Sequence, residues 1–366
     1  MKVRLKDYVE LVSDKTKNNK DIDSYVSTEN LLSDKQGVRF PATSVSNSKY
    51  IQTYRKDDVL ISNIRPYFKK IWKAERSGTH SNDVLCFRSK TDSLLQNFLY
   101  IILQSDRFFE FVSKNSKGTK MPRGDKKAIM QYEFELPSLS EQIKISNQVL
   151  SFEDKVLLNN QINDNLFELN KIIFNKVFAS SKNYVPASDI AEIKIGKTPP
   201  RKEKQWFSVD KGINWLSIKD MKSEGIFSMQ SKEKLLSSAI NKFNIQTVNE
   251  DTVLLSFKLT IGRVKLAAQE MVTNEAIAQF KNSKLPYQYL YTYLKLFHFE
   301  TLGSTSSIAK AINSKILKSM PILKPSTDDL NKYMNTAKPI FEKVKINQLE
   351  NINLLNIKKY LLNKLK

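Results

Sequence analysis

The residues in this sequence with the most distinctive chemistry are lysines and arginines gathered on short loops. Residues 117–127 run Lys-Gly-Thr-Lys-Met-Pro-Arg-Gly-Asp-Lys-Lys, and these glycines and charges predict an exposed loop. Lysine and arginine neutralise phosphates, and arginine also reads base edges through paired hydrogen bonds. We therefore predict that this loop contacts nucleic acid. The candidate contacts in the first half of the chain are Arg65, Lys69, Lys70, Lys117, Lys120, Arg123, Lys126 and Lys127.

A second basic group lies in the other half of the chain. It includes the small-residue segment 303–310. The position of this segment within the second repeat is nearly the same as that of Gly118-Thr-Lys120 within the first repeat. For any single residue the alternative is a solvated surface lysine, because lysine is abundant throughout, so the groups carry more weight as sets. Trp206 and Trp215 are interpreted as packing anchors rather than base-stacking groups. The candidate contacts in this half are Lys197, Arg201, Lys202, Lys219, Lys258, Arg263 and Lys310.

The charge balance also indicates a polyanionic partner. The 366 residues include 59 Lys and Arg against 38 Asp and Glu, a formal net charge of +21. Nucleic acid is the first candidate partner and an anionic membrane surface the second. The membrane is disfavoured because the sequence has neither an apolar run of about 18 residues nor a start like that of a signal peptide. We expect a soluble, cytoplasmic protein, and a single Cys86 with distant His80 and His298 predicts neither a disulfide nor a metal site.

Patterns that suggest catalysis lack residues that catalysis requires. Gly196-Lys-Thr198 ends like a phosphate-binding loop, but Ala191 stands where that loop needs glycine. No Asn-Pro-Pro-aromatic or Asp-Pro-Pro-aromatic motif of an amino-methyltransferase occurs, and no Gly-rich cofactor loop follows a strand. Glu192-Ile-Lys194 resembles the end of a nuclease site, but metal-dependent cleavage also needs an upstream carboxylate. We expect no catalytic residue and no cofactor.

The elements that must position these loops occur twice. Asp57-Asp-Val-Leu-Ile-Ser62 returns as Asp251-Thr-Val-Leu-Leu-Ser256, and Leu99-Tyr100 returns as Leu290-Tyr291, in the same order. Short β-branched and apolar runs predict strands, and the stretches 94–113 and 286–300 predict helices. Each half is therefore expected to begin with a mixed α/β domain.

Each half ends in a heptad pattern, with entries spaced alternately by three and four residues. The first pattern contains no Gly or Pro, so a continuous helix of about 40 residues, roughly 60 Å long, is expected. Apolar positions return as apolar, and two asparagines return as asparagines. The first pattern is Val149, Phe152, Val156, Asn159, Asn163, Leu166, Asn170, Ile173 and Val177. The second is Ala337, Ile340, Val344, Asn347, Asn351, Leu354, Lys358, Leu361 and Leu365.

These observations predict an α+β fold with two mixed domains, two long helices in an antiparallel coiled coil and a pseudo-twofold internal repeat. The expected domains are residues 1–137, 138–182, 183–325 and 326–366, alternately globular and helical. Asparagine in a helix seam fixes register when it finds a partner. If the helices pair antiparallel, Asn163 and Asn351 are expected to meet at the centre. The alternative is that each helix packs only on its own globular domain.

The succession of motifs resembles the specificity subunits of type I restriction-modification systems. In the second domain the motifs are Ile195-Gly-Lys-Thr-Pro-Pro-Arg201, Trp215-Leu-Ser-Ile-Lys-Asp-Met221 and Ile261-Gly-Arg-Val264. Leu136-Pro-Ser-Leu-Ser-Glu-Gln-Ile143, which leads into the first long helix, resembles the central conserved region of that family. The first recognition domain matches only loosely. Ser138 replaces a second proline, and Lys324-Pro-Ser-Thr-Asp-Asp329 lacks the Glu-Gln pair, so two docking sites at these segments would differ in strength.

The resemblance implies a non-catalytic subunit of a restriction endonuclease and adenine methyltransferase complex, used in phage defence. Each recognition domain would read one half of a split double-stranded DNA target, and the helices would set the spacing and bind two methyltransferase subunits. The assembly would recruit the restriction subunits, which are motor-nucleases. Two other readings stay open at this point. One is a coiled-coil scaffold that binds nucleic acid without sequence preference, and the other is an enzyme with an unrecognised nuclease site.

Overall fold

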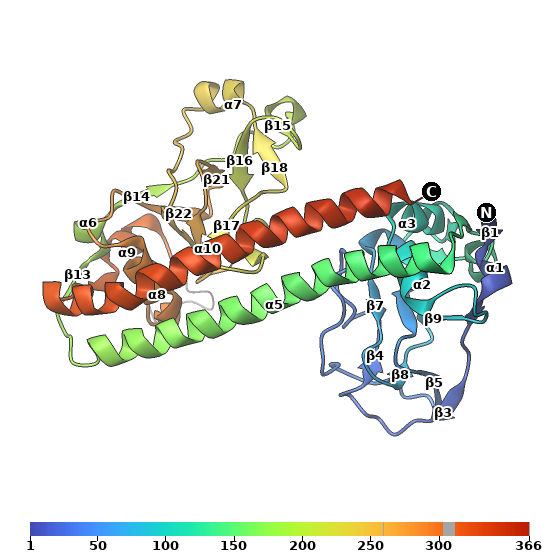
Figure 1. The fold of residues 1–366 in the computed structure, drawn as a ribbon. Helices are drawn as coiled ribbons and strands as arrows, with labels where there is room; N and C mark the ends of the chain where they lie inside the picture. The colour runs from blue at the N-terminus through green and yellow to red at the C-terminus, as the bar shows by residue number, and fades with distance from the viewer. Residues whose placement is uncertain (259, 303–311, 366) are drawn as a thin grey trace. The chain divides into compact units, whose positions relative to one another are not determined.

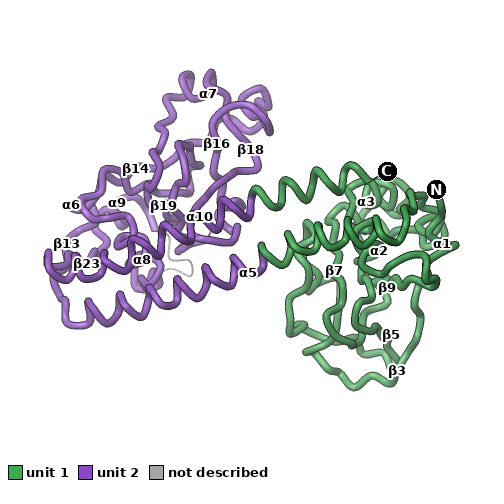
Figure 2. Tube along the Cα trace, in the orientation of Figure 1, with its two compact units in different colours: residues 1–155, 353–366 green, residues 156–352 purple. Residues whose placement is uncertain are grey.

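The computed structural model describes residues 1–258, 260–302 and 312–365. The chain divides into two compact units (Figure 2): unit 1 holds residues 1–155 and 353–366, and unit 2 holds residues 156–352. The long helices α5 (Leu139–Phe178) and α10 (Thr327–Lys364) are labelled in Figure 1, and Figure 2 shows that each runs through both units. Each unit therefore combines a globular domain with a part of both helices.

Both long helices begin at the same kind of capping box, in which a serine and an acidic residue three positions later exchange hydrogen bonds. The Ser138 N–H donates to Glu141 Oε2 at 3.1 Å, and the Glu141 N–H donates to Ser138 Oγ. In α10 the Asp329 N–H donates to Ser326 Oγ at 3.2 Å, and the Ser326 hydroxyl donates to Asp329 Oδ2. Helix α10 continues through Pro339, although proline lacks the N–H that the helix would use.

Five asparagines join α5 to α10 inside unit 2: four at seam positions, and Asn160, whose Oδ1 accepts from Asn351 Nδ2 at 2.8 Å. Asn159 Nδ2 donates to Asn351 Oδ1, and Asn347 Nδ2 donates to Asn163 Oδ1, each at 2.8 Å. This crossed numbering makes the helices antiparallel in unit 2. The predicted pairing of Asn163 with Asn351 is wrong, because the local twofold axis passes between two asparagine pairs. The observed register gives all four amides an amide partner, whereas the predicted one would pair only two.

The central sheet of unit 1 has the strand order β2-β9-β6-β7, and every pair is antiparallel. Its strands are mostly buried because their apolar side chains pack against helices and against the ends of α5 and α10. Val149 of α5 and Leu362 of α10 belong to the same apolar cluster as the sheet. The elements are β2 (Val9–Leu11), β6 (Val59–Ser62), β7 (Ile71–Lys73), β9 (Val84–Ser89), α2 (Gln96–Leu103) and α3 (Asp106–Lys114).

The central sheet of unit 2 repeats this order as β14-β22-β19-β20 and adds a fifth strand, β17. The register also repeats, since Val59 lies opposite Phe87 as Val253 lies opposite Phe280. The fifth strand is held by Gln348 of α10, whose Oε1 accepts from the Phe227 N–H at 3.0 Å. The elements are β14 (Glu192–Ile195), β17 (Phe227–Ser228), β19 (Val253–Ser256), β20 (Val264–Ala267), β22 (Ile277–Lys281) and α8 (Tyr287–Leu296).

A second, smaller sheet in each unit differs between the repeats. In unit 1 the order is β3-β5-β8-β4, and in unit 2 it is β15-β18-β16-β21. The unit 1 strands are β3 (Lys15–Lys17), β4 (Tyr25–Val26), β5 (Tyr50–Tyr54) and β8 (Gly78–His80). The unit 2 strands are β15 (Phe207–Ser208), β16 (Ile213–Leu216), β18 (Glu233–Leu235) and β21 (Val272–Thr273).

Short elements complete the two units. In unit 1 they are β1 (Lys2–Arg4), α1 (Leu5–Tyr8), η1 (Pro66–Phe68), β10 (Ser116–Lys117), β11 (Arg123–Gly124), α4 (Lys126–Ile129) and β12 (Glu133–Glu135). In unit 2 they are β13 (Tyr184–Pro186), α6 (Ala187–Ile190), η2 (Lys204–Trp206), η3 (Asp220–Lys222), α7 (Ser237–Lys242), η4 (Phe299–Thr301), α9 (Ser314–Ser319) and β23 (Pro321–Leu323). None of the described helices has both the length and the apolar character needed to cross a bilayer.

The predicted fold class is confirmed, with two mixed domains, two long helices and an internal repeat. The predicted helical stretch over 94–113 is confirmed as two helices, α2 and α3, because Ser105 caps the second and its hydroxyl accepts the Phe108 N–H at 3.2 Å. The stretch 286–300 likewise ends its α-helix at Leu296 and continues in the 3-10 turn η4.

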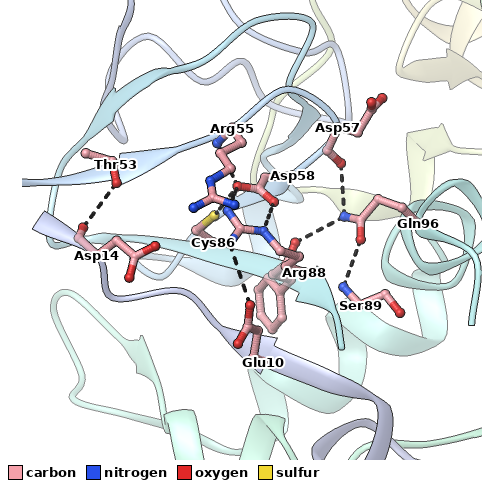
Figure 3. Close-up of polar contacts among 11 residues, drawn as sticks. Glu10, Asp14, Thr53, Arg55, Asp57, Asp58, Cys86, Arg88, Ser89 and Gln96 are labelled. Atoms are coloured by element: carbon pink, nitrogen blue, oxygen red, sulfur yellow. Dashed lines mark hydrogen bonds and ion pairs between the residues drawn. The ribbon is translucent and has the colours of Figure 1, made fainter. Parts of the chain in front are cut away.

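A buried ion pair closes the turn before β6 in unit 1 (Figure 3). Arg88 on β9 donates two hydrogen bonds to Asp58, at 2.7 Å from Nε and 2.6 Å from the terminal nitrogen. The Asp58 side chain is only 3% exposed, and its Oδ2 also accepts the Arg55 N–H. Burial, together with this carboxylate, raises the pKa of the Cys86 thiol well above its usual range. Cys86 is therefore a packing residue and not a reactive thiol.

Candidate nucleic-acid interface

The basic loop predicted over 117–127 forms a hairpin up to Gly124, which lies against the β6–β7 turn, and then enters helix α4, which carries Lys126 and Lys127. Strands β10 and β11 pair Lys117 with Arg123. The Arg65 N–H donates to the Pro122 carbonyl at 2.8 Å, and the Gly124 N–H donates to the Asn63 carbonyl at 3.1 Å. The structure thus brings Arg65 together with the 117–127 loop, although more than 50 residues separate them in sequence.

The cations of the 117–127 segment differ in exposure and in whether they form ion pairs. Lys117 is ion-paired with Asp125 at 2.7 Å, and Arg123 with Asp83 at 3.0 Å. The Lys117 side chain remains 82% exposed. Lys120, Lys126 and Lys127 are exposed, and the described part of the chain holds no ion pair for them. These three lysines are the cations best placed to meet phosphates.

Two other candidates of the first half, Lys69 and Lys70, hold the β6–β7 turn in place. Lys69 and Lys35 both contact Asp106 Oδ1 at 2.7 Å. Burial alone would raise the pKa of Asp106, but the hydrogen bonds from Lys35 and Lys69 lower it to about 2. Lys70 donates to the Thr28 carbonyl, and burial lowers its pKa. Sequence reasoning did not single out Lys35 or Asp106, because their pairing depends on the tertiary fold.

Arg65 is partly buried and sits at an unusual backbone position. Its φ of 51° lies in the left-handed region, which residues other than glycine seldom adopt. Its Nε is buried without a hydrogen-bond partner in the described residues. Such strain and unpaired polar atoms concentrate at functional positions.

In the second half, Lys197 and Arg201 lie beside the smaller sheet. The Trp215 indole donates to the Lys197 carbonyl at 3.3 Å. The Arg201 guanidinium lies 4.3 Å from the Phe207 ring and 5.0 Å from the Trp215 ring, and it pairs with Glu233 at 2.9 Å. Trp215 is buried, as predicted for a packing anchor. Arg201 is thus held by aromatic rings and a carboxylate.

The remaining described candidates in the second half lie on exposed loops, and Arg263 and Lys219 are brought close together. Arg263 donates to the Ile218 carbonyl at 2.8 Å, which places it beside the loop that carries Lys219. Lys202, Lys219 and Lys258 are exposed. Lys310 and the segment 303–310 lie outside the described residues.

The nuclease-like Glu192 is part of an ordinary sheet edge. Its carboxylate pairs with Lys194 at 2.8 Å, accepts from Asn282, and lies opposite Lys281. The hydrogen bond from Lys194 lowers the pKa of Glu192. In the described ranges no three His, Cys, Asp or Glu side chains converge as a metal ion would require.

Sequence reasoning missed two sets of exposed apolar side chains. The first is the tip of the β6–β7 turn, where Tyr67 is 52% and Phe68 38% exposed. The second is a row on each long helix, outside the heptad seam. The exposed side chains of that second set are Leu158, Leu169 and Ile172 on α5, and Ile346, Ile357 and Tyr360 at the repeat-equivalent positions of α10. An exposed row that returns in both repeats was the sequence signal for the second set.

Comparisons with known proteins agree on one family. The model of the type I restriction modification DNA specificity domain matches residues 1–168 and 181–360. The chain is 20% identical to the type I restriction enzyme HindI specificity subunit of Haemophilus influenzae, over 93% of each protein. It is 26% identical to the type I restriction enzyme MjaIX specificity subunit of Methanocaldococcus jannaschii, over 39% of this chain and 34% of that one. The type I restriction-modification S subunit from M. genitalium shares its fold, with a TM-score of 0.57 at 12% identity over 100% of this chain and 95% of that chain.

Proposed function

Because the chain belongs to the family of type I restriction-modification DNA specificity subunits, we propose that it reads a two-part DNA target and brings the other subunits to it. Specificity subunits of type I systems are non-catalytic. The observation that carries the proposal is the duplicated central sheet, with the same strand order and register in both units. Two copies of one reading domain suit a target with two halves.

Each domain would hold DNA through its own basic surface. In unit 1 that surface is the 117–127 segment with Lys120, Lys126 and Lys127, next to Arg65. In unit 2 it is the loops that carry Lys219, Lys258 and Arg263, with Lys202 on the neighbouring loop after Arg201. Phosphate contacts of this kind position the duplex, and base contacts from the neighbouring loops would add sequence preference. The smaller sheets differ in strand order between the units, which suits two different half-sites.

The long helices would set the distance between the half-sites and bind two methyltransferase subunits. Their exposed apolar rows support this role, because an apolar row on a surface helix marks a contact with another protein. Leu158, Leu169 and Ile172 share one face of α5, since they are separated by eleven and three residues. The equivalent row on α10 gives a second docking surface. The assembly would then recruit the restriction subunits, and it would act on DNA in the cytoplasm.

The experiment that tests the reading role is methylation mapping. The chain is expressed with its neighbouring genes in a host, and methylated adenines in the host DNA are mapped by single-molecule sequencing. We expect a bipartite motif that disappears when this chain is deleted and loses one half when one recognition domain is exchanged. Unchanged methylation, without a copurifying methyltransferase, would favour the nucleic-acid-binding scaffold instead.

The docking role is tested by charge substitution on the apolar rows. Ile172→Asp and Tyr360→Asp are each expected to remove one methyltransferase from the purified complex, and the double variant both, as measured by native mass spectrometry. Ile172→Leu keeps the apolar contact and is the matched control. Retention of both methyltransferases by the double variant would exclude these rows as the docking surfaces.

A further inference from the structure

The tip of the β6–β7 turn carries an exposed aromatic pair, Tyr67 and Phe68, that lies outside the apolar cluster of unit 1, although Tyr67 also lines a hollow beside Phe109 of α3. Pro66–Phe68 form one 3-10 turn, and Arg65 and Lys69 flank it, both with φ of 51°. The Tyr67 and Phe68 rings lie 4.8 Å apart at their centroids. Large aromatic side chains are usually buried or used for binding. This pair is therefore held outside the core at a cost in backbone strain.

Neighbouring loops fix the tip on both sides. The Asp34 N–H donates to the Phe68 carbonyl at 2.8 Å, and the Lys35 N–H donates to the Lys69 carbonyl at 2.9 Å. On the other side, the Arg65 N–H donates to Pro122 of the basic hairpin. The ion pairs from Lys35 and Lys69 to Asp106 add a third anchor. A tip held this firmly loses little conformational entropy when it binds.

The chemistry around the tip favours a nucleic acid over a protein partner. The hairpin that anchors Arg65 carries the exposed Lys120, and its Met121 is 50% exposed. Of the acidic residues near the tip, Asp106 is neutralised by two lysines. Glu110 lines the hollow beside Tyr67 together with Lys69 and Lys114, so cations outnumber the acid there as well. Apolar side chains flanked by cations are the means by which proteins enter DNA between base pairs.

The same loop of the second repeat has a related but smaller tip. The loop from β19 to β20 exposes Ile261 at 37%, between Lys258 and Arg263, and Gly262 has a φ of 89°. An apolar tip flanked by cations thus stands after the same strand in both units. Among the described residues of the unit 2 loop, Phe257 is buried, and the Phe299 ring packs beside Gly262 instead of standing at the tip.

We propose that Tyr67 and Phe68 form a wedge that enters between two base pairs of the half-site read by unit 1 and unstacks them. This inference rests on the proposed function. Unit 1 would then select its half-site partly by how easily a base step opens, and pyrimidine–purine steps open most easily. Unit 2, with Ile261 alone, would distort its half-site less.

The test uses the complete complex of this chain with its methyltransferases, and duplexes of the mapped target. 2-Aminopurine is placed in turn at each position of the unit 1 half-site other than the methylated adenine, because flipping of that base would raise the fluorescence by itself. We expect a fluorescence rise at one base step. In Tyr67→Ala/Phe68→Ala the rise disappears, and affinity for the target falls about 5- to 150-fold, the range for loss of one stacking contact.

Two controls make the result specific. Tyr50→Ala removes an exposed aromatic ring elsewhere in unit 1 and should leave fluorescence and affinity unchanged. Tyr67→Phe keeps the stacking surface and should keep the rise. The wedge is excluded if no position responds in the wild-type complex, or if the double variant loses a methyltransferase while keeping the DNA signal. Failure of the proposed function shows separately, as absence of any bipartite methylated motif.

Discussion

At the scale of single residues, lysine serves three different purposes in this chain. Lys120 is exposed and available to phosphates. Lys69 fixes a turn through Asp106. Lys265 is buried in β20, where it donates to the Ser223 and Gly225 carbonyls that precede the added strand β17, and burial lowers its pKa to about 8. A high lysine content therefore describes the charge of the molecule but not the role of any one lysine.

The Asp58–Arg88 pair predicts a large effect from a single substitution. Arg88→Met leaves the buried Asp58 carboxylate without its main partner, which is expected to destabilise unit 1 by about 3 kcal/mol. Hydrogen exchange of the β6 and β9 amides measures this loss. Arg123→Met is the control, because its pair with Asp83 is exposed and should cost less than about 1 kcal/mol. Equal losses in the two variants would contradict the assignment.

The Asp106 carboxylate predicts an acid-dependent loss of stability. Its folded pKa of about 2 lies below the ordinary value of 3.8, so it stabilises the folded state above that ordinary value. This contribution is lost as pH falls from about 4 towards 2. The difference in urea midpoint between wild type and Asp106→Asn should be constant near neutral pH and shrink over this window. A difference independent of pH would refute the role of the two lysines.

At the scale of elements, the two repeats differ in a matched way where their helices begin. Gln142 of α5 accepts the Leu95 N–H at 2.9 Å and donates to the carbonyls of Ser93 and Pro137. In the second repeat Leu330 takes the place of Gln142, and α8 starts after Pro286, which has no N–H to satisfy. The second repeat thus lacks both the side-chain acceptor and the backbone donor.

This pairing predicts a coupled substitution. Gln142→Leu leaves the Leu95 N–H unpaired and is expected to destabilise unit 1 by about 2 kcal/mol. Adding Leu95→Pro removes that N–H, and the φ of −72° at Leu95 suits proline, so part of the loss should return. Thermal melts of the four proteins of the double-mutant cycle measure the coupling. Simple additivity of the two changes would contradict it.

The same elements show what sequence could predict here. Both long helices were predictable because an uninterrupted heptad pattern has few other solutions, and strands such as Val59–Ser62 and Val253–Ser256 were marked by apolar runs. The register of the asparagines was not predictable, because the heptad pattern of one helix does not fix its height against the other. The Tyr67–Phe68 tip was missed because its exposure depends on hydrogen bonds from two distant loops.

At the scale of the whole molecule, the boundary between the compact units falls inside both long helices, at Lys155–Val156 and at Ile352–Asn353. Each unit keeps its own core and its own stretch of helix pair. Extra residues at these two positions should therefore leave each reading domain intact. The length of the helices, and with it the proposed DNA spacer, could then be changed without changing the two half-sites.

Inserting seven helical residues at both positions predicts a longer spacer in the DNA target. A heptad keeps the seam on the same face and adds about 10 Å, or about 3 base pairs. Methylation mapping should show the same two half-sites with a spacer longer by that amount. Insertion into α5 alone should abolish methylation instead, since the helices no longer match. An unchanged spacer after the double insertion would show that the helices do not set it.

The two asparagine pairs of unit 2 together select one alignment of α5 against α10. Slipping α5 by one turn in one direction would bring Asn163 opposite Asn351, but Asn159 would then face Leu355 and Asn347 would face Phe167. A slip in the other direction would join Asn159 to Asn347 and set the remaining two against Lys343 and Lys155. Either slip leaves two of these four asparagines without their amide partner, and only the observed alignment pairs all four. A buried amide without a partner costs about 1–3 kcal/mol, so each slipped alignment of α5 and α10 in unit 2 is disfavoured by the loss of two such partners.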